Sequence, residues 1–202
     1  MQIGSMQRFS LIDYPGKICA IVFHDEIFSF LERRRGKLDA VSITGGEPTI
    51  HENLVEFIKK IKDLGYLVKI DTNGSIPEIL EILMGEHLLD SIAMDVKAPF
   101  DKYKKIAGIP LDTRLIEKSI HLIMNSGIDY EFRTTIVRSL LDEKDIKKIG
   151  IVIEGADRYV LQKFVPSKTL NPKFMNATTY TDEEFERTSK LLEKLVKSVI
   201  IR

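Results

Sequence analysis

Residues 40–48 read Ala40-Val-Ser-Ile-Thr-Gly-Gly-Glu-Pro48, an apolar run that ends in two glycines, a glutamate and a proline. The run predicts a strand, and its polar end predicts a turn. Gly45 and Gly46 permit unusual backbone dihedrals and let a ligand approach without a Cβ in the way. Because Pro48 holds Glu47 extended, we expect the carboxylate and nearby carbonyls to point outward, as a receptor for a ligand ammonium group. A plain strand-to-helix turn is the alternative interpretation.

A helix is predicted directly after this turn. Thr49 and Glu52 have the spacing of a capping box, and Gly65 ends the helical repeat of apolar residues. The same alternation recurs along the chain. Strands are expected at 18–23, 40–44, 66–71, 91–97, 130–137 and 159–165, and helices near 25–36, 50–64, 76–84, 112–126, 142–154 and 181–198. Six β–α units in strict alternation predict a parallel sheet with crossover helices.

One face of several predicted strands becomes polar toward its carboxyl end, as in the series Ser91, Ala93, Asp95 and Lys97. A doubly wound sheet buries both faces and has near-continuous apolar runs, whereas polar strand ends are typical of a barrel with an active site at its mouth. We therefore predict an α/β fold: an open partial (βα)6 barrel, with a parallel sheet and outer helices. Residues 1–202 are expected to form this single domain, with a doubly wound sheet as the alternative.

The composition excludes several classes of partner. Thirty basic residues offset thirty acidic ones, so no net charge would attract nucleic acid or an anionic membrane. No apolar run reaches the roughly 20 residues that a membrane span needs. A single cysteine in 202 residues excludes an internal disulfide framework and favours a cytoplasmic protein. That residue, Cys19, lies in an apolar run and is expected to be a buried core thiol.

Two further polar segments follow predicted strands. In Asp71-Thr-Asn-Gly74, the carboxylate suits ribose hydroxyls, although Asn-Gly is also a common turn. Asp95 and Lys97 share a strand face, where they would either contact a ligand or form an internal ion pair. Arg133 suits a ligand carboxylate, and its alternative role is to pair with Glu131 or Asp95.

The order of these motifs resembles that of the radical S-adenosylmethionine (SAM) superfamily. Gly-Gly-Glu-Pro follows the second predicted strand, Asp-Thr-Asn-Gly the third and Met-Asp-Val-Lys the fourth. The segment Ser10-Leu-Ile-Asp-Tyr-Pro-Gly-Lys17 is similar to one in the activating proteins of glycyl radical enzymes, especially of anaerobic ribonucleotide reductase and pyruvate formate-lyase. Phe132-Arg-Thr-Thr135 and Leu161-Gln-Lys-Phe164 also fall where that group has similar runs.

The resemblance implies an anaerobic oxidoreductase. In that family, SAM bound to a 4Fe-4S cluster is reduced and cleaved to methionine and a 5′-deoxyadenosyl radical, which takes hydrogen from a glycine of a large partner enzyme. A flavodoxin or ferredoxin would supply the electron. By position, the first motif would hold the methionine amino group. Asp71 would face the ribose, with Asp95 near it, and Lys97 or Arg133 would bind the SAM carboxylate. The implied cofactor site is Gly45, Gly46, Glu47, Asp71, Asp95, Lys97 and Arg133.

The chain departs from the family in one segment. Family members have a Cys-x3-Cys-x2-Cys loop directly after the first strand, whereas this chain runs from Phe23 into His24 without one. Cys19 precedes that point and matches no motif cysteine, so we identify no metal ligand and expect the chain as it stands to be inactive. The next helix resumes in register, as expected if one contiguous block were absent between Phe23 and about His24.

Two explanations are open. In the first, the natural protein has the cluster loop and is a radical SAM activating enzyme. In the second, the chain is a cluster-less relative that binds SAM or a partner protein without redox catalysis. A third, weaker hypothesis is a metal-independent barrel enzyme acting on a phosphorylated sugar, for which residues 165–169 would be a poor phosphate loop.

Overall fold

The structure is a computed structural model that describes residues 7–10, 19–21, 27–108, 111–166 and 174–202. The chain divides into two compact units, the first made of residues 1–93 and 121–130 and the second of residues 94–120 and 131–202. The prediction that the chain is a single domain remains a prediction.

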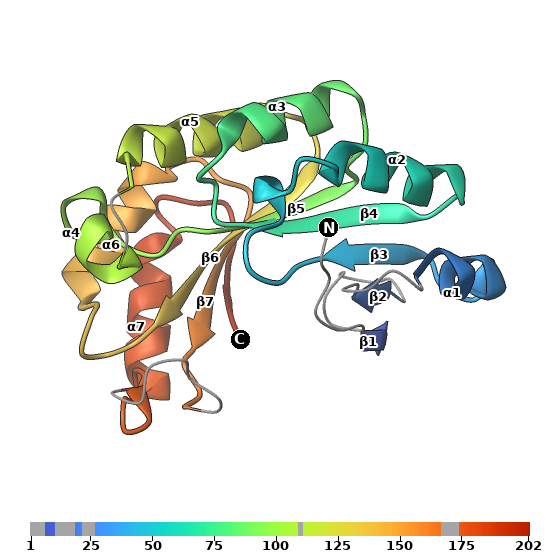
Figure 1. The fold of residues 1–202 in the computed structure, drawn as a ribbon. Helices are drawn as coiled ribbons and strands as arrows, with labels where there is room; N and C mark the ends of the chain where they lie inside the picture. Colours follow the sequence, from blue (N-terminus) through green and yellow to red (C-terminus); the bar gives the residue numbers. More distant parts are fainter. Residues whose placement is uncertain (1–6, 11–18, 22–26, 109–110, 167–173) are drawn as a thin grey trace. The chain divides into compact units, whose positions relative to one another are not determined.

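The first unit is built on four successive strands. They are β1 (Gln7–Ser10), β2 (Cys19–Ile21), β3 (Ala40–Ile43) and β4 (Leu67–Thr72). β1 is antiparallel to β2, whereas β2, β3 and β4 are parallel, with Val41 opposite Ala20 and Val68. The helices of this unit are α1 (Ile27–Arg34), the 3-10 helix η1 (Pro48–Ile50), α2 (Leu54–Asp63) and α3 (Pro77–Gly85). In Figure 1, α2 runs alongside β4 and buries Ile58 and Ile61.

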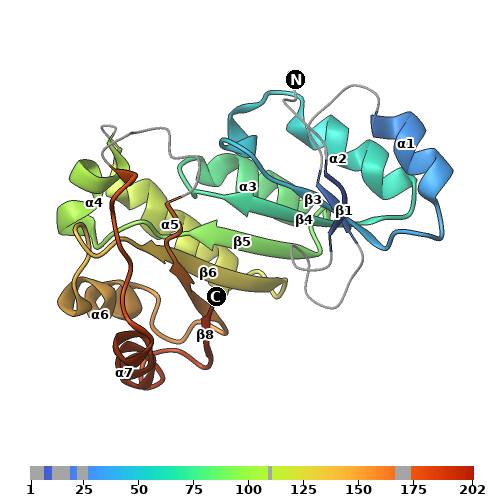
Figure 2. The same cartoon turned by 90° about the horizontal axis from the view of Figure 1, so that it is seen from below.

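The second unit contains the parallel strands β6 (Asp129–Ile136, from residue 131), β7 (Tyr159–Lys163) and β8 (Val199–Ile201). β5 (Ser91–Asp95) and α5 (Thr113–Met124) contribute residues to both units. The remaining helices are α4 (Phe100–Ala107), α6 (Glu143–Val152) and α7 (Asp182–Leu192). Figures 1 and 2 show α6 beside α7. The two helices approach so closely that a Cβ on Gly150 would lie 2.5 Å from Leu192 Cδ2.

The predicted alternation is confirmed. Every predicted strand has a counterpart among β2 to β7, although only residues 19–21 of the first are described. The predicted helices correspond to α1, α2, α3, α5, α6 and α7; α3 is shifted by one residue, and the others have shorter bounds. The sequence pattern did not predict β1, α4 or β8. The helix expected to reach residue 198 ends at Leu192 because the chain turns there into β8, which pairs with β7.

The strand faces also behave as predicted. Along one face of β6, Glu131 is buried, Arg133 is partly exposed and Thr135 is exposed. Along β5 and the residues after it, Ala93 is buried, Asp95 is partly exposed and Lys97 is exposed. Polar side chains therefore reach solvent at the carboxyl ends of these strands, where the predicted site residues lie.

Candidate functional site

The turn after β3 exposes its backbone. Gly45 and Gly46 are exposed and have φ values of 96° and 61°, which L side chains rarely adopt. A Cβ on Gly46 would meet no heavy atom within 4 Å, so the dihedrals rather than lack of space require glycine there. The main chain of this turn is open to an approaching ligand, as the sequence predicted.

The Glu47 carboxylate points inward, so the prediction of an outward receptor for an ammonium group was wrong. Glu47 is extended, with φ −131° and ψ 108°, as Pro48 requires, but it is only 8% exposed. Oε1 accepts hydrogen bonds from Thr49 N at 3.1 Å, Thr49 Oγ1 at 2.6 Å and Thr72 Oγ1 at 2.8 Å. Oε2 accepts one from Asn73 N at 2.5 Å. Because four protein donors occupy this carboxylate, a ligand ammonium group would meet the backbone carbonyls of the turn instead.

The predicted capping box between Thr49 and Glu52 was also wrong. The Thr49 hydroxyl donates to Glu47, and Thr49 lies in η1 rather than at a helix cap. Helix α2 begins at Leu54, and its N-cap residue Asn53 makes no side-chain cap hydrogen bond. The side chain of Thr49 therefore makes a local hydrogen bond to Glu47, two residues before it, and does not serve as the helix cap that the spacing predicted.

The turn after β4 is tied to the turn after β3. Asn73 and Gly74 form the tight turn that the sequence predicted, with Gly74 at φ 71° and Ser75 N donating to Asn73 Oδ1 at 2.9 Å. Thr72 donates to Glu47 and accepts from Gly74 N at 3.0 Å. Thr72 was not among the predicted site residues. Its place beside a predicted turn was the only signal that could have suggested this role.

Asp71 lies on β4 beside a buried lysine. Lys69 Nζ lies 2.6 Å from Asp71 Oδ1, and the two side chains are 3% and 15% exposed. The two residues are two apart on β4 and so share one strand face, and the sequence alone assigned no role to Lys69. Ser42 is opposite Lys69 in the β3–β4 register, and its buried Oγ has no hydrogen-bond partner among the described residues.

In the second unit, Arg133 pairs with Asp95. Arg133 Nε donates to Asp95 Oδ1 at 2.9 Å, and the two side chains are 13% and 42% exposed. Of the two partners proposed for Arg133, Asp95 is therefore confirmed. Lys97 is exposed and pairs with no acidic side chain in the described part of the chain, so the internal Asp95–Lys97 ion pair does not form.

Glu131 has other partners. Arg202 Nη1 and Nη2 donate to its two carboxylate oxygens, both at 3.0 Å, and Arg158 Nε lies 3.7 Å from Oε2. The Glu131 side chain is 3% exposed. This buried cluster joins β6 to the end of β8, which is a structural role.

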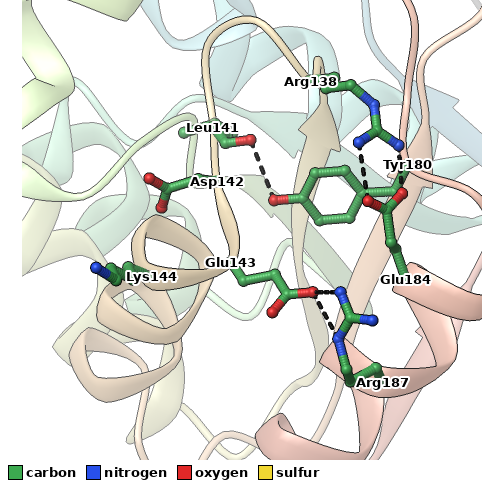
Figure 3. A pocket seen from close by; sticks show the side chains of 8 residues that line it. All are labelled: Arg138, Leu141, Asp142, Glu143, Lys144, Tyr180, Glu184 and Arg187. Carbon is green, nitrogen blue, oxygen red and sulfur yellow. Dashed lines mark hydrogen bonds and ion pairs between the residues drawn. The ribbon is translucent and has the colours of Figure 1, made fainter.

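A pocket of about 360 Å³ lies among the loop after β6, the start of α6, the segment before α7 and α7 itself (Figure 3). None of the predicted site residues lines it. Arg138 donates to both carboxylate oxygens of Glu184 and thereby lowers the pKa of Glu184 to about 2. Arg187 pairs with Glu143 from the opposite helix. These two ion pairs connect the loop before α6 and the start of α6 to α7, so the arginines and glutamates of the pocket have a structural role.

The described residues contain no group of three His, Cys, Asp or Glu side chains that could hold a metal ion. Cys19 lies in β2, but its side chain and the Phe23–His24 join are outside the described residues. A 4Fe-4S cluster takes three or four cysteine thiolates, and the chain has one cysteine. The residues present therefore do not fit the cluster.

The comparison with protein families decides the relationship. The model of the Radical SAM superfamily matches residues 22–149, more than half of the chain. The chain belongs to the radical SAM superfamily. A radical SAM relative from Methanocaldococcus jannaschii, provisionally named a glycyl-radical enzyme activating enzyme, is 33% identical and covers 99% of this chain and 95% of its own. That match runs over 229 positions, whereas the chain has 202 residues, so at least 27 positions of the relative have no counterpart here.

Solved structures confirm the predicted fold class, an open parallel α/β arrangement of the radical SAM type. A domain of pyruvate-formate lyase-activating enzyme from Bacteroides vulgatus is 20% identical, with a TM-score of 0.63 over 81% of this chain and 99% of that domain. Streptococcus suis SuiB bound to its precursor peptide gives a TM-score of 0.67 at 13% identity, over 88% of this chain and 41% of SuiB. No helix in the described part of this radical SAM protein is long and apolar enough to cross a membrane.

Proposed function

We propose that this protein is the SAM-binding scaffold of a glycyl radical enzyme activating enzyme. The observation that carries the proposal is the 33% identity to the M. jannaschii relative along nearly the whole of both chains. The partner would be a large anaerobic enzyme of the ribonucleotide reductase or pyruvate formate-lyase type. A flavodoxin or ferredoxin would donate the electron, and the reaction would take place in the cytoplasm.

The residues of the chain suit the binding of SAM. The exposed backbone carbonyls of Gly45 and Gly46 would accept the methionine ammonium group, and Glu47 would hold their turn in place. Asp71 would face the ribose, with Asp95 near it. Arg133 or Lys97 would bind the SAM carboxylate, and Lys97 has its side chain exposed for this role.

The chain itself does not supply a cluster site, and we derive no chemical step through one. We propose that the natural protein carries a cysteine loop between β2 and α1, at the join of Phe23 and His24. The at least 27 unmatched positions of the M. jannaschii relative are ample for a Cys-x3-Cys-x2-Cys loop. The intact glycine turn and the Asp71 and Asp95 carboxylates support this explanation, because a chain without a cluster would have no use for them.

Two measurements test the proposal. Calorimetry on the 202-residue chain is expected to show SAM binding. The protein with its loop, reconstituted anaerobically with iron, sulfide and reductant, is expected to release 5′-deoxyadenosine from SAM. If the loop-containing protein neither assembles a cluster nor cleaves SAM, the proposed activity is wrong.

The second candidate function is a SAM-binding module without redox chemistry. The single cysteine and the lack of a metal-ligand group in the described residues favour it. It requires that the natural protein have the 23.1 kDa mass of this chain, bind SAM and show none of the visible absorbance of an iron–sulfur cluster. A natural mass larger by a few kDa, with added cysteines, would exclude it.

A further inference from the structure

The most unusual charge in the first unit is the ammonium group of Lys69. The residue is 2% exposed and lies in the middle of β4, where an unpaired ammonium group would be costly. It forms an ion pair with Asp71 Oδ1 at 2.6 Å, on the same strand face. Ser42, opposite it in register, adds a buried hydroxyl with no hydrogen-bond partner in the described part of the chain. A polar row therefore runs through an otherwise apolar sheet toward the carboxyl end of β4.

A structural purpose explains this pair poorly. Replacing a buried ion pair by apolar side chains is often neutral or stabilising, so the pair is weak evidence for stability. The same unit contains an ion pair with an evident structural purpose, between Lys62 Nζ and Asp90 Oδ2 at 2.7 Å. Asp90 also accepts a hydrogen bond from Val68 N, so that pair fixes the amino-terminal end of β4. Its side chains are 27% and 25% exposed, so it avoids most of the desolvation that Lys69 incurs.

The effect of Lys69 is to fix the Asp71 carboxylate. The backbone around Asp71 is held at the residues before it by the pairing of β4 with β3. At the residues after it, Thr72 and Asn73 donate hydrogen bonds to Glu47. The ammonium group then sets the orientation of the side chain, because Lys69 Nζ lies 2.6 Å from Asp71 Oδ1. A fixed carboxylate just beyond the middle of a parallel strand is well suited to the hydroxyls of a ribose.

We propose that Lys69 is a positioning residue for nucleoside recognition: it orients the Asp71 carboxylate, which accepts hydrogen bonds from the vicinal ribose hydroxyls of the ligand. This inference rests on the proposed function, since it takes SAM as the ligand. Lys69 would then help the protein to discriminate between a ribose and a deoxygenated sugar without contacting the ligand itself.

The test compares two ligands on the 202-residue chain by calorimetry. The probes are S-adenosylhomocysteine and its analogue with both ribose hydroxyls replaced by hydrogen. The wild type is expected to prefer the first by about tenfold or more, as hydrogen bonds to a charged group imply. In Lys69→Met and Lys69→Gln, the affinity for the deoxygenated analogue is expected to remain and the preference to fall below about threefold. Lys62→Met is the matched control and should keep the full preference.

The ratio of two affinities is insensitive to partial unfolding, because unfolded protein lowers both equally. Lys69→Gln keeps a hydrogen-bond donor and provides a folded variant if Lys69→Met unfolds. A full preference in either Lys69 variant overturns the inference but leaves the proposed function intact. If the wild type binds neither ligand, the proposed function fails, and this inference fails with it.

Discussion

The turns after β3 and β4 in the first unit and the pocket of the second unit are both held together by a glutamate, but the two glutamates differ in burial and in the charge of their partners. In each, a glutamate joins two segments that are distant in sequence. Glu47 is 8% exposed, and the donors that it binds within the described part of the chain are neutral groups of Thr49, Thr72 and Asn73. Glu184 is partly exposed and pairs with Arg138, while also accepting from Thr181 N at 2.7 Å.

The difference shows that burial, rather than formal charge, decides how much such a contact contributes. Buried donors that lose their acceptor are left without water, whereas partly exposed ions regain it. The first unit therefore depends on a few buried polar contacts near its candidate site. In the second unit, the pocket residues in Figure 3 are expected to be individually replaceable, because close helix packing joins α6 and α7.

The largest effect is expected at the buried pair of the first unit. Lys69→Met removes the ammonium partner of the Asp71 carboxylate, whose side chain is 15% exposed, which should lower the free energy of unfolding by about 3–5 kcal/mol. Urea denaturation followed by circular dichroism measures this. The double variant Lys69→Met/Asp71→Asn removes both charges and should recover most of the loss. A double variant no more stable than the single one would contradict this explanation.

Glu47→Ala should have the next largest effect. It leaves the buried Thr72 hydroxyl and the amides of Thr49 and Asn73 without their acceptor, which should cost about 2–4 kcal/mol. The matched control is Glu52→Ala, an exposed carboxylate five residues further on, which should change stability by less than about 0.5 kcal/mol. An equal loss of unfolding free energy in the two variants would refute this role of Glu47.

Gly150→Ala tests the packing of the second unit. The new Cβ would lie 2.5 Å from Leu192 Cδ2 and 3.0 Å from Leu195 Cδ1, and Leu192 is buried. Separating α6 from α7 should cost about 1–3 kcal/mol in urea denaturation. Gly85→Ala is the control, because its Cβ would meet nothing within 4 Å at the end of α3. If Gly150→Ala is as stable as that control, close packing does not hold these helices together.

The smallest effect is expected at Glu184, and it should depend on pH. The Arg138 guanidinium lowers the pKa of Glu184 from 4.5 to about 2, so its contribution is complete above pH 4.5 and is lost as the pH falls through about 2. The difference in Tm between the wild type and Glu184→Gln should therefore shrink over that interval, and should also shrink at high salt. Glu186→Gln, which removes the same charge at an exposed neighbour on α7, is the control. A difference that is constant over this pH range would contradict the assignment.

Local patterns predicted most of the fold and part of the site. Alternating apolar runs located β2 to β7, and the predicted turns form with positive φ values at Gly45, Gly46 and Gly74. Failures came where two segments compete for the same group. The predicted capping box would have the Thr49 hydroxyl accept from Glu52 N, and only the fold shows that this hydroxyl donates to Glu47. The strand β8 is three residues long, too short for a periodic signal, and forms because β7 offers an edge.

The β–α order, the glycine turns after β3 and β4, the polar carboxyl ends of the strands and the lack of enough cysteines for a cluster can all be predicted from the amino-acid sequence. These depend on residue type and on spacing along the chain, which are local properties. The direction of the Glu47 carboxylate, the pairing of Arg133 with Asp95 and the burial of Lys69 follow from the fold. Each of these depends on a donor or an apolar surface that is distant in sequence, and such groups come into contact only once the strands have paired.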